Sequence, residues 1–230
     1  IMNIYVRSSI SILLFTLIFL IIIRLSSQSL YIITHGIHIR RCESVSSAER
    51  MSILKKMYNL LATEFDKNDI NVWLEYGTLL GYLRQKDLIC YDYDIDFGAL
   101  YKDNEKIKTI MENIVSNNPE YSFQDIGISP YLIRKHVLVH TKTEINADIF
   151  YYDYVGDDII TRGIFYKPLG INSNATKKSK WIFPLKKIRF LNMNIYIPND
   201  PSELLTFYYG ENHLIPDHMC DSTCDRCVKI

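Results

Sequence analysis

Residues 77–98 read GTLLGYLRQKDLICYDYDIDFG, and the fold prediction starts from this stretch. Its last part alternates acidic residues with aromatic or aliphatic ones, which is the pattern of a β-strand with one polar and one apolar face. Asp92, Asp94 and Asp96 then line one face, while the residues between them point into the core. The small residues that begin the stretch predict a turn and a short helix ahead of this strand.

The acidic face predicts a divalent metal site. Three carboxylates at intervals of about 6–7 Å along a strand repel one another unless a cation lies among them. Mg²⁺ and Mn²⁺ take oxygen ligands, and Mg²⁺ binds through one or two carboxylates plus substrate phosphates, so Asp92, Asp94 and Asp96 are expected to hold a metal against a pyrophosphate. A solvated strand face is the alternative, and the apolar opposite face argues against it. A calcium loop is rejected, because it needs Gly and Glu where the chain has Phe97 and Asp103.

A fourth carboxylate, Asp148, lies in the apolar run EINADIFYY at residues 144–152. If its strand neighbours the strand of Asp94 and Asp96, Asp148 supplies a base for an attacking hydroxyl or a ligand to a second metal. A buried structural aspartate is an equally weighted alternative.

Four residues of the preceding turn and helix are candidates for binding phosphate. Gly77, Thr78 and Gly81 are small, so backbone N–H groups could approach a phosphate at a helix start. Arg84 has the charge and the fork geometry to hold phosphate oxygens, although a surface salt bridge would use it equally well.

The rest of the chain mixes helical and strand patterns. Ser46 followed by Glu49 is a capping box, and apolar residues then recur at intervals of three and four up to Phe65, which predicts a helix that ends by Asn68. Further elements are expected as strands at 70–76, 131–140 and 145–154, a helix at 103–117, a hairpin at 181–198 and a short helix at 202–209. The chain is therefore predicted to be α/β, with helices flanking a mixed sheet.

Composition and charge restrict the class of protein. The 230 residues are 48% hydrophobic and 23% charged, so a packed core is expected. Basic and acidic residues both number 26, which argues against a partner that is a nucleic acid.

An uncharged apolar segment, SSISILLFTLIFLIII at residues 8–23, lies between Arg7 and Arg24. A membrane-spanning helix needs about 20 apolar residues, with a lower limit near 17, so this segment is predicted to be an uncleaved signal anchor. A cleaved signal peptide and a buried core helix are the alternatives. The excess of positive charge after the segment, at Arg24, Arg40 and Arg41, favours a cytosolic location for the following chain. The glycosylation pattern at Asn174 and the five cysteines favour a lumenal one.

The C-terminal tail contains Cys220, Cys224 and Cys227, close to two histidines. Three thiolates and an imidazole would suit a structural Zn²⁺ site. Disulfides that also involve Cys42 or Cys90 are the alternative and are preferred for a lumenal chain. The predicted organisation is an anchor at 1–24, a stem at 25–45, the α/β domain at 46–219 and the cysteine-rich tail at 220–230.

Several segments between Val72 and Asn212 carry a family resemblance. They are Gly77-Thr78-Leu79-Leu80-Gly81, Arg84, Tyr91-Asp92-Tyr93-Asp94-Ile95-Asp96, Asp148-Ile149-Phe150, Phe183-Pro184-Leu185, Pro198 and Tyr209-Gly210. In this order and spacing they resemble the LicD/fukutin group of nucleotidyltransferase-fold proteins, which includes phosphocholine and ribitol-phosphate transferases. Family members usually have proline and tryptophan where this chain has Cys90 and Tyr91, a difference that concerns the fit of the donor more than the metal site.

The resemblance implies a nucleotidyltransferase-like core and a CDP-activated donor. A hydroxyl of a glycan acceptor, on a glycoprotein or glycolipid, would attack the phosphorus nearest the carried group, and CMP would leave. The carried group would be of the ribitol phosphate or phosphocholine type. Asp94, Asp96 and Asp148 would be catalytic, with Mg²⁺ or Mn²⁺ as cofactor. The implied location is a single-pass membrane protein of the Golgi or ER with a lumenal catalytic domain.

Two other functions compete with this hypothesis. A nucleotide-sugar glycosyltransferase also binds a metal through alternating aspartates, but it usually has a larger domain and does not need the GTLLG turn. A catalytically inactive binding module of the same fold is the third hypothesis, and the intact set of acids argues against it.

Overall fold

The computed structural model describes residues 45–126, 135–155, 158–161, 176–221, 224 and 226–230. The chain divides into two units, Ile1–Ser44 and Val45–Ile230, and the description below concerns the second. The predicted anchor and nearly all of the predicted stem lie outside the described residues, as do Cys42 and Asn174. Within the described ranges, no helix combines the length and the apolar character that crossing a membrane requires.

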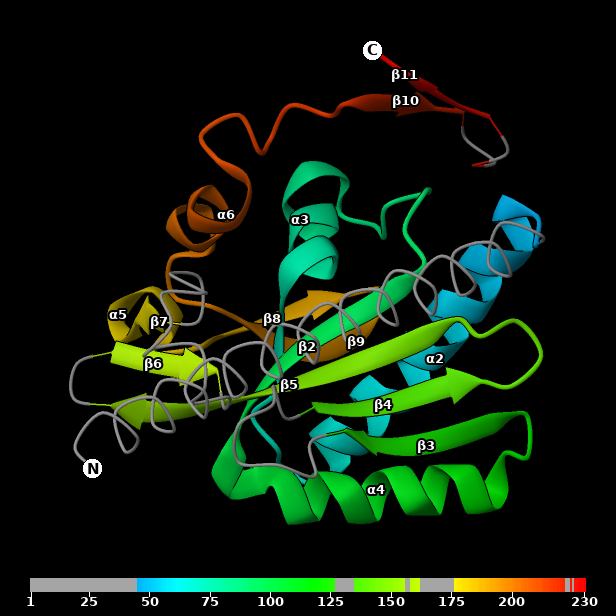
Figure 1. The fold of residues 1–230 in the computed structure, drawn as a ribbon, viewed down its shortest axis with the longest axis vertical. Helices are drawn as coiled ribbons and strands as arrows, with labels where there is room; N and C mark the ends of the chain where they lie inside the picture. Colours follow the sequence, from blue (N-terminus) through cyan, green and yellow to red (C-terminus); the bar gives the residue numbers. More distant parts are fainter. Residues whose placement is uncertain (1–44, 127–134, 156–157, 162–175, 222–223, 225) are drawn as a thin grey trace, which may run out of the picture. The chain divides into compact units, whose positions relative to one another are not determined.

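The second unit contains helices and strands in mixed order (Figure 1). In chain order they are α2 (Ser47–Lys67), β1 (Trp73–Leu74), α3 (Tyr76–Gln85), β2 (Asp94–Leu100), the 3-10 turn η1 (Tyr101–Asp103), α4 (Asn104–Asn117), β3 (Tyr121–Ile126), β4 (Lys135–His140), β5 (Asn146–Val155), β6 (Asp158–Thr161), β7 (Thr176–Lys178), α5 (Ser179–Ile182), β8 (Lys186–Phe190), β9 (Met193–Ile197), α6 (Pro201–Tyr209), β10 (His218–Cys220) and β11 (Cys227–Lys229).

One mixed sheet organises this unit. Its strands follow the order β3-β4-β5-β2-β1-β9-β8, and β6 and β7 extend it from β5. Strand β2 is parallel to β5 and β1 is parallel to β9, whereas the other pairs are antiparallel. The predicted fold class, a mixed sheet with flanking helices, is therefore confirmed. A separate two-stranded sheet, β10 with β11, forms the tail.

Helix α2 covers one face of the sheet. The Ser46 hydroxyl accepts a hydrogen bond from the Glu49 N–H at 3.2 Å, as the capping pattern predicts. The ring of Tyr58 stacks on Phe97 of β2 at 6.0 Å between centroids, and Phe65 meets the same ring edge-on at 5.7 Å. Phe97 follows Asp96 along β2 and so points to the face opposite the acids.

Helices α3 and α6 lie together near the other face of the sheet (Figure 1). On the face that carries the acids, the indole of Trp73 of β1 lies against the backbone of β2 at Gly98. The contact is so close that a Cβ at Gly98 would lie only 2.2 Å from the indole Cε2. Gly98 therefore allows the Trp73 indole to lie against β2 on the face that carries the acids.

The structure corrects several predicted boundaries. Strand β2 begins at Asp94, not at Tyr91, because the Asp92 carboxylate accepts a hydrogen bond from the Tyr93 N–H at 3.0 Å and holds this part of the chain in a turn. The expected short helix is present as α3, but it begins at Tyr76, the last residue of the strand expected at 70–76, and the strand before it has only two residues. The short helix α5 occupies the beginning of the expected 181–198 hairpin, while β3 and the tail hairpin were not predicted.

Candidate active site

Three acids meet where β2 and β5 run side by side. The two strands are parallel, and their register places Asp96 opposite Asp148. Asp94 precedes Asp96 by two residues and so shares its face. Ligand oxygens of Asp94, Asp96 and Asp148 all lie within 4.8 Å of one another, and we call these residues the acid cluster. The sequence placed Asp148 here only on the condition that the two strands are neighbours, and they are.

The acid cluster is buried enough to disfavour its own charge. Asp96 is 8% exposed and Asp148 4%. Burial raises the pKa of Asp96 well above its usual range, and the negative charges of Asp94 and Asp148 raise it further. A divalent cation held by these hard oxygen donors would offset the cost of burying the charges and their mutual repulsion, so the residues fit a Mg²⁺ or Mn²⁺ ion.

Asp92 lies beside the cluster and not within it. Burial and the charge of Asp94 raise its pKa well above the usual range. It also lies against the start of α3, where a Cβ at Gly77 would be 2.4 Å from the Asp92 Oδ2. The structure therefore groups Asp148 with Asp94 and Asp96, where the sequence pattern had grouped Asp92.

Two neighbours that the sequence analysis missed hold Asp148 in place. The Lys135 ammonium forms an ion pair with Oδ2 of Asp148, and the Asn146 amide donates to Oδ1 at 3.0 Å. Lys135 belongs to β4, which is antiparallel to β5, so only the pairing of these strands reveals the contact. Both carboxylate oxygens of Asp148 are thus oriented before any ligand binds.

The segment that joins β1 to α3 fixes the backbone of Asp96. The Thr78 hydroxyl accepts a hydrogen bond from the Asp96 N–H at 2.9 Å, and the Glu75 N–H donates to the Asp96 carbonyl at 3.0 Å. Thr78 was predicted to bind the donor. Its hydroxyl in the structure holds the backbone N–H of Asp96, and its role in binding the donor stays a prediction.

The other residues of the predicted phosphate site have structural contacts. A Cβ at Gly81 would lie 2.6 Å from the Asp87 carbonyl oxygen, so this glycine allows the 87–89 segment to pass close to α3. Arg84 donates from Nε to the His213 carbonyl at 2.7 Å and from Nη2 to the Ile215 carbonyl at 3.1 Å. Arg84 therefore ties α3 to the C-terminal tail, and its role in phosphate binding stays a prediction.

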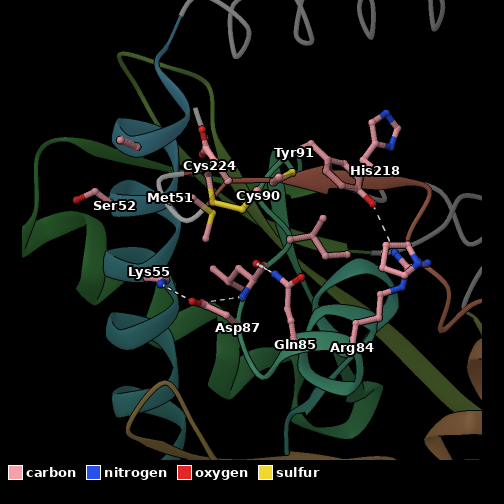
Figure 2. Close-up of a pocket in the computed structure, with 16 residues that line it drawn as sticks. Met51, Ser52, Lys55, Arg84, Gln85, Asp87, Cys90, Tyr91, His218 and Cys224 are labelled. Carbon is pink, nitrogen blue, oxygen red and sulfur yellow. Dashed lines mark hydrogen bonds and ion pairs between the residues drawn. A yellow bond between two sulfur atoms is a disulfide. The ribbon is translucent and has the colours of Figure 1, made fainter. Parts of the chain in front are cut away.

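The tail cysteines form disulfides, as preferred for a lumenal chain. Cys220 pairs with Cys227 within the tail, and Cys224 pairs with Cys90 across 134 residues (Figure 2). These bonds use all three of the thiols that the alternative Zn²⁺ site would require.

A pocket of about 520 Å³ lies beside the Cys90–Cys224 disulfide. Its walls come from α2, from the segment between α3 and β2, and from the tail, with Lys55 and Asp87 joined by a 2.8 Å ion pair on one side (Figure 2). The described residues that line this pocket include no member of the acid cluster.

The described residues form an α/β domain that carries three clustered acids on two neighbouring inner strands of a mixed sheet. Residues 69–200 match the family model of the LicD/FKTN/FKRP nucleotidyltransferase domain, and the chain belongs to this family.

Individual relatives support the same assignment. The chain is 29% identical over 159 residues to an uncharacterized protein of Rickettsia typhi, a match that covers 69% of this chain and 45% of that protein. It is 27% identical over 173 residues to the human ribitol-5-phosphate transferase FKTN, covering 70% of this chain and 33% of that protein. The Macaca fascicularis ribitol-5-phosphate transferase FKTN is 28% identical with the same coverage. The chain thus spans less than half the length of these relatives.

Proposed function

We propose that this chain is a divalent-metal-dependent transferase that moves a phosphate-linked group from a CDP-activated donor to a hydroxyl of a glycan, with release of CMP. The observation that carries the proposal is the meeting of Asp94, Asp96 and Asp148 within 4.8 Å in a domain of this family. The relatives named as ribitol-5-phosphate transferases support a transfer of phosphate-linked groups.

Each residue of the site has a defined task in this proposal. Asp94, Asp96 and Asp148 hold the cation through carboxylate oxygens. Thr78 keeps the backbone of Asp96 in position, and Lys135 orients Asp148. Because the fixed groups lie on two hydrogen-bonded strands, they need little rearrangement during reaction, and such preorganisation is the main source of rate in phosphoryl transfer.

The bound Mg²⁺ or Mn²⁺ would supply positive charge that offsets the charge gathering on the phosphate oxygens. The buried position of the acids serves the same end, since electrostatic interactions strengthen where water is excluded. The proposal includes membrane anchoring through residues 8–23, which rests on their apolar sequence alone.

The test is release of CMP from defined donors. The purified protein is incubated with Mn²⁺ or Mg²⁺, a glycan acceptor and CDP-ribitol, CDP-glycerol or CDP-choline, and CMP is quantified. We expect CMP from at least one donor, loss of release in EDTA, and a loss of about 100-fold or more in Asp94→Asn. Asp69→Asn, an equal change of charge at an exposed residue, is the matched control. Release of a nucleoside diphosphate from a sugar nucleotide, with no CMP from the CDP donors, would replace the proposal with a glycosyltransferase.

A further inference from the structure

A buried lysine lies among three tyrosines near the acid cluster. Lys177 is 1% exposed, and its ammonium is 4.3 Å from the ring centroid of Tyr152, 5.1 Å from that of Tyr208 and 5.8 Å from that of Tyr76. It also donates a hydrogen bond to the Tyr152 hydroxyl at 3.0 Å. Cations are attracted to aromatic faces within about 6 Å, so these three rings form a cation-binding tyrosine cage that Lys177 occupies.

Glu75 supplies the opposite charge. Its fully buried carboxylate accepts hydrogen bonds from the Trp73 indole at 2.5 Å, from the Tyr152 hydroxyl at 3.1 Å and from the Tyr208 hydroxyl. Burial lowers the pKa of Lys177 to about 8, and the charge of Glu75 opposes this decrease. The ammonium is therefore desolvated and held by a defined network.

The tyrosine cage adjoins the acid cluster through one short segment. Within residues 75–78, the side chains of Glu75 and Tyr76 belong to the network around Lys177. The Glu75 N–H and the Thr78 hydroxyl of the same segment hydrogen-bond to the backbone of Asp96 in the acid cluster.

Strand β5 makes the same connection. It presents Asp148 to the acid cluster and Tyr152, four residues or roughly 13 Å further on, to the tyrosine cage. Phe150 lies between them on the same face and packs edge-on against Tyr76 at 5.2 Å. A group that extends from a phosphate at the acid cluster along this strand would reach the cage.

We infer that Lys177 is a specificity-determining residue that excludes a quaternary-ammonium headgroup and restricts the carried group to a neutral polyhydroxyl chain. The inference rests on the proposed function. A ring cage of this kind is a usual receptor for trimethylammonium groups, but here the chain's own ammonium fills it. A second cation would be excluded because the Lys177 side chain fills the space between the rings and its positive charge repels another cation. The Lys177 ammonium, which has three N–H donors, and the oxygen of the Tyr208 hydroxyl instead offer hydrogen-bond partners to the hydroxyls of an alditol.

The first experiment uses tetramethylammonium and needs no donor. Lys177→Ala empties the cage, whereas Lys177→Met removes the charge and keeps an unbranched side chain of similar length. At pH 7 we expect tetramethylammonium to raise the melting temperature of the Ala variant at concentrations about tenfold or more below those needed for wild type or the Met variant. Recovery of folded Ala variant only when tetramethylammonium is present would support the inference equally. An identical response of wild type and the folded Ala variant would overturn it.

The second experiment compares donors on the wild-type protein, so its deciding outcome does not depend on the folding of a variant. With Mn²⁺ bound, we expect CDP-ribitol to bind at least about tenfold more tightly than CDP-choline, and Lys177→Ala to reduce this ratio. Equal affinity of wild type for both donors would overturn the inference. Absence of binding by any CDP compound, with the tetramethylammonium effect intact, would overturn the proposed function and not the assignment of the cage.

Discussion

Replacing Asp96 by Asn tests the metal site most directly, because Asn keeps the shape of the side chain and removes its charge. The backbone bonds of Asp96 to Thr78 and Glu75 do not involve the side chain and should remain. Two carboxylates at the 4.8 Å limit of the cluster repel by roughly 3–4 kcal/mol at an effective dielectric constant of about 20. Without metal, the variant is therefore expected to be more stable than wild type near neutral pH.

The pH dependence of stability follows from the same charges. The folded-state pKa of Asp96 is raised, so metal-free wild-type protein keeps a proton that the unfolded chain loses above about pH 4. Stability then decreases as pH rises from that value towards the raised pKa. Asp96→Asn should weaken this decrease.

Metal should stabilise the wild-type protein and leave the Tm of Asp96→Asn unchanged. A ligand at 100 times its Kd stabilises the folded state by about 2.7 kcal/mol, which for a domain of this size corresponds to roughly 5–10 °C in Tm. Thermal unfolding in EDTA and in saturating Mn²⁺ should show this rise in wild type and in the surface control Asp69→Asn, and no rise in Asp96→Asn. An Asp96→Asn protein that keeps the full Mn²⁺ effect, or its CMP release, would refute the reasoning.

Other predictions concern the support of the site and its chemistry. Thr78→Val leaves a buried N–H without its acceptor, so we expect a loss of about 1–3 kcal/mol in urea unfolding together with slower CMP release, whereas Thr78→Ser should behave as wild type. Gly98→Ala forces a methyl group against Trp73, and chemical unfolding should show a loss of about 1–3 kcal/mol or misfolding; a stable variant would contradict this packing. Cys224→Ser opens the long bond to Cys90, and we expect a loss of roughly 2–5 kcal/mol of stability, seen as a lower Tm; reductant should lower the Tm of wild type more than that of the variant, which keeps only the Cys220–Cys227 bond. Calorimetric Mn²⁺ affinity should increase with pH, because Asp96, whose pKa is raised by burial and by its acidic neighbours, must lose its proton to bind metal; affinity independent of pH between 5 and 8 would argue against Asp96 as a ligand.

Local patterns were enough to identify the core of the site. Alternation placed Asp94 and Asp96 on one face of a strand, and that face does not depend on what the strand pairs with. The capping pair at Ser46 and Glu49 likewise involves residues three apart, so the sequence contains both partners of the interaction. The acidic strand β2, the helix α2 and the α/β class could therefore be predicted from local sequence patterns.

The partners of these residues depended on tertiary structure. Lys135 meets Asp148 because β4 and β5 pair in one register, and Lys177 reaches the tyrosine cage because β7 extends the same sheet. Asp92 lies outside the acid cluster because the chain turns at this residue and β2 begins only at Asp94, and its role as a metal ligand stays a prediction. Pairing between strands distant in the chain is fixed by the packing of the whole core, which no short window of sequence specifies. The sequence by itself determined which residues carry the negative charge of the site, and only the tertiary structure decided which groups surround and balance that charge.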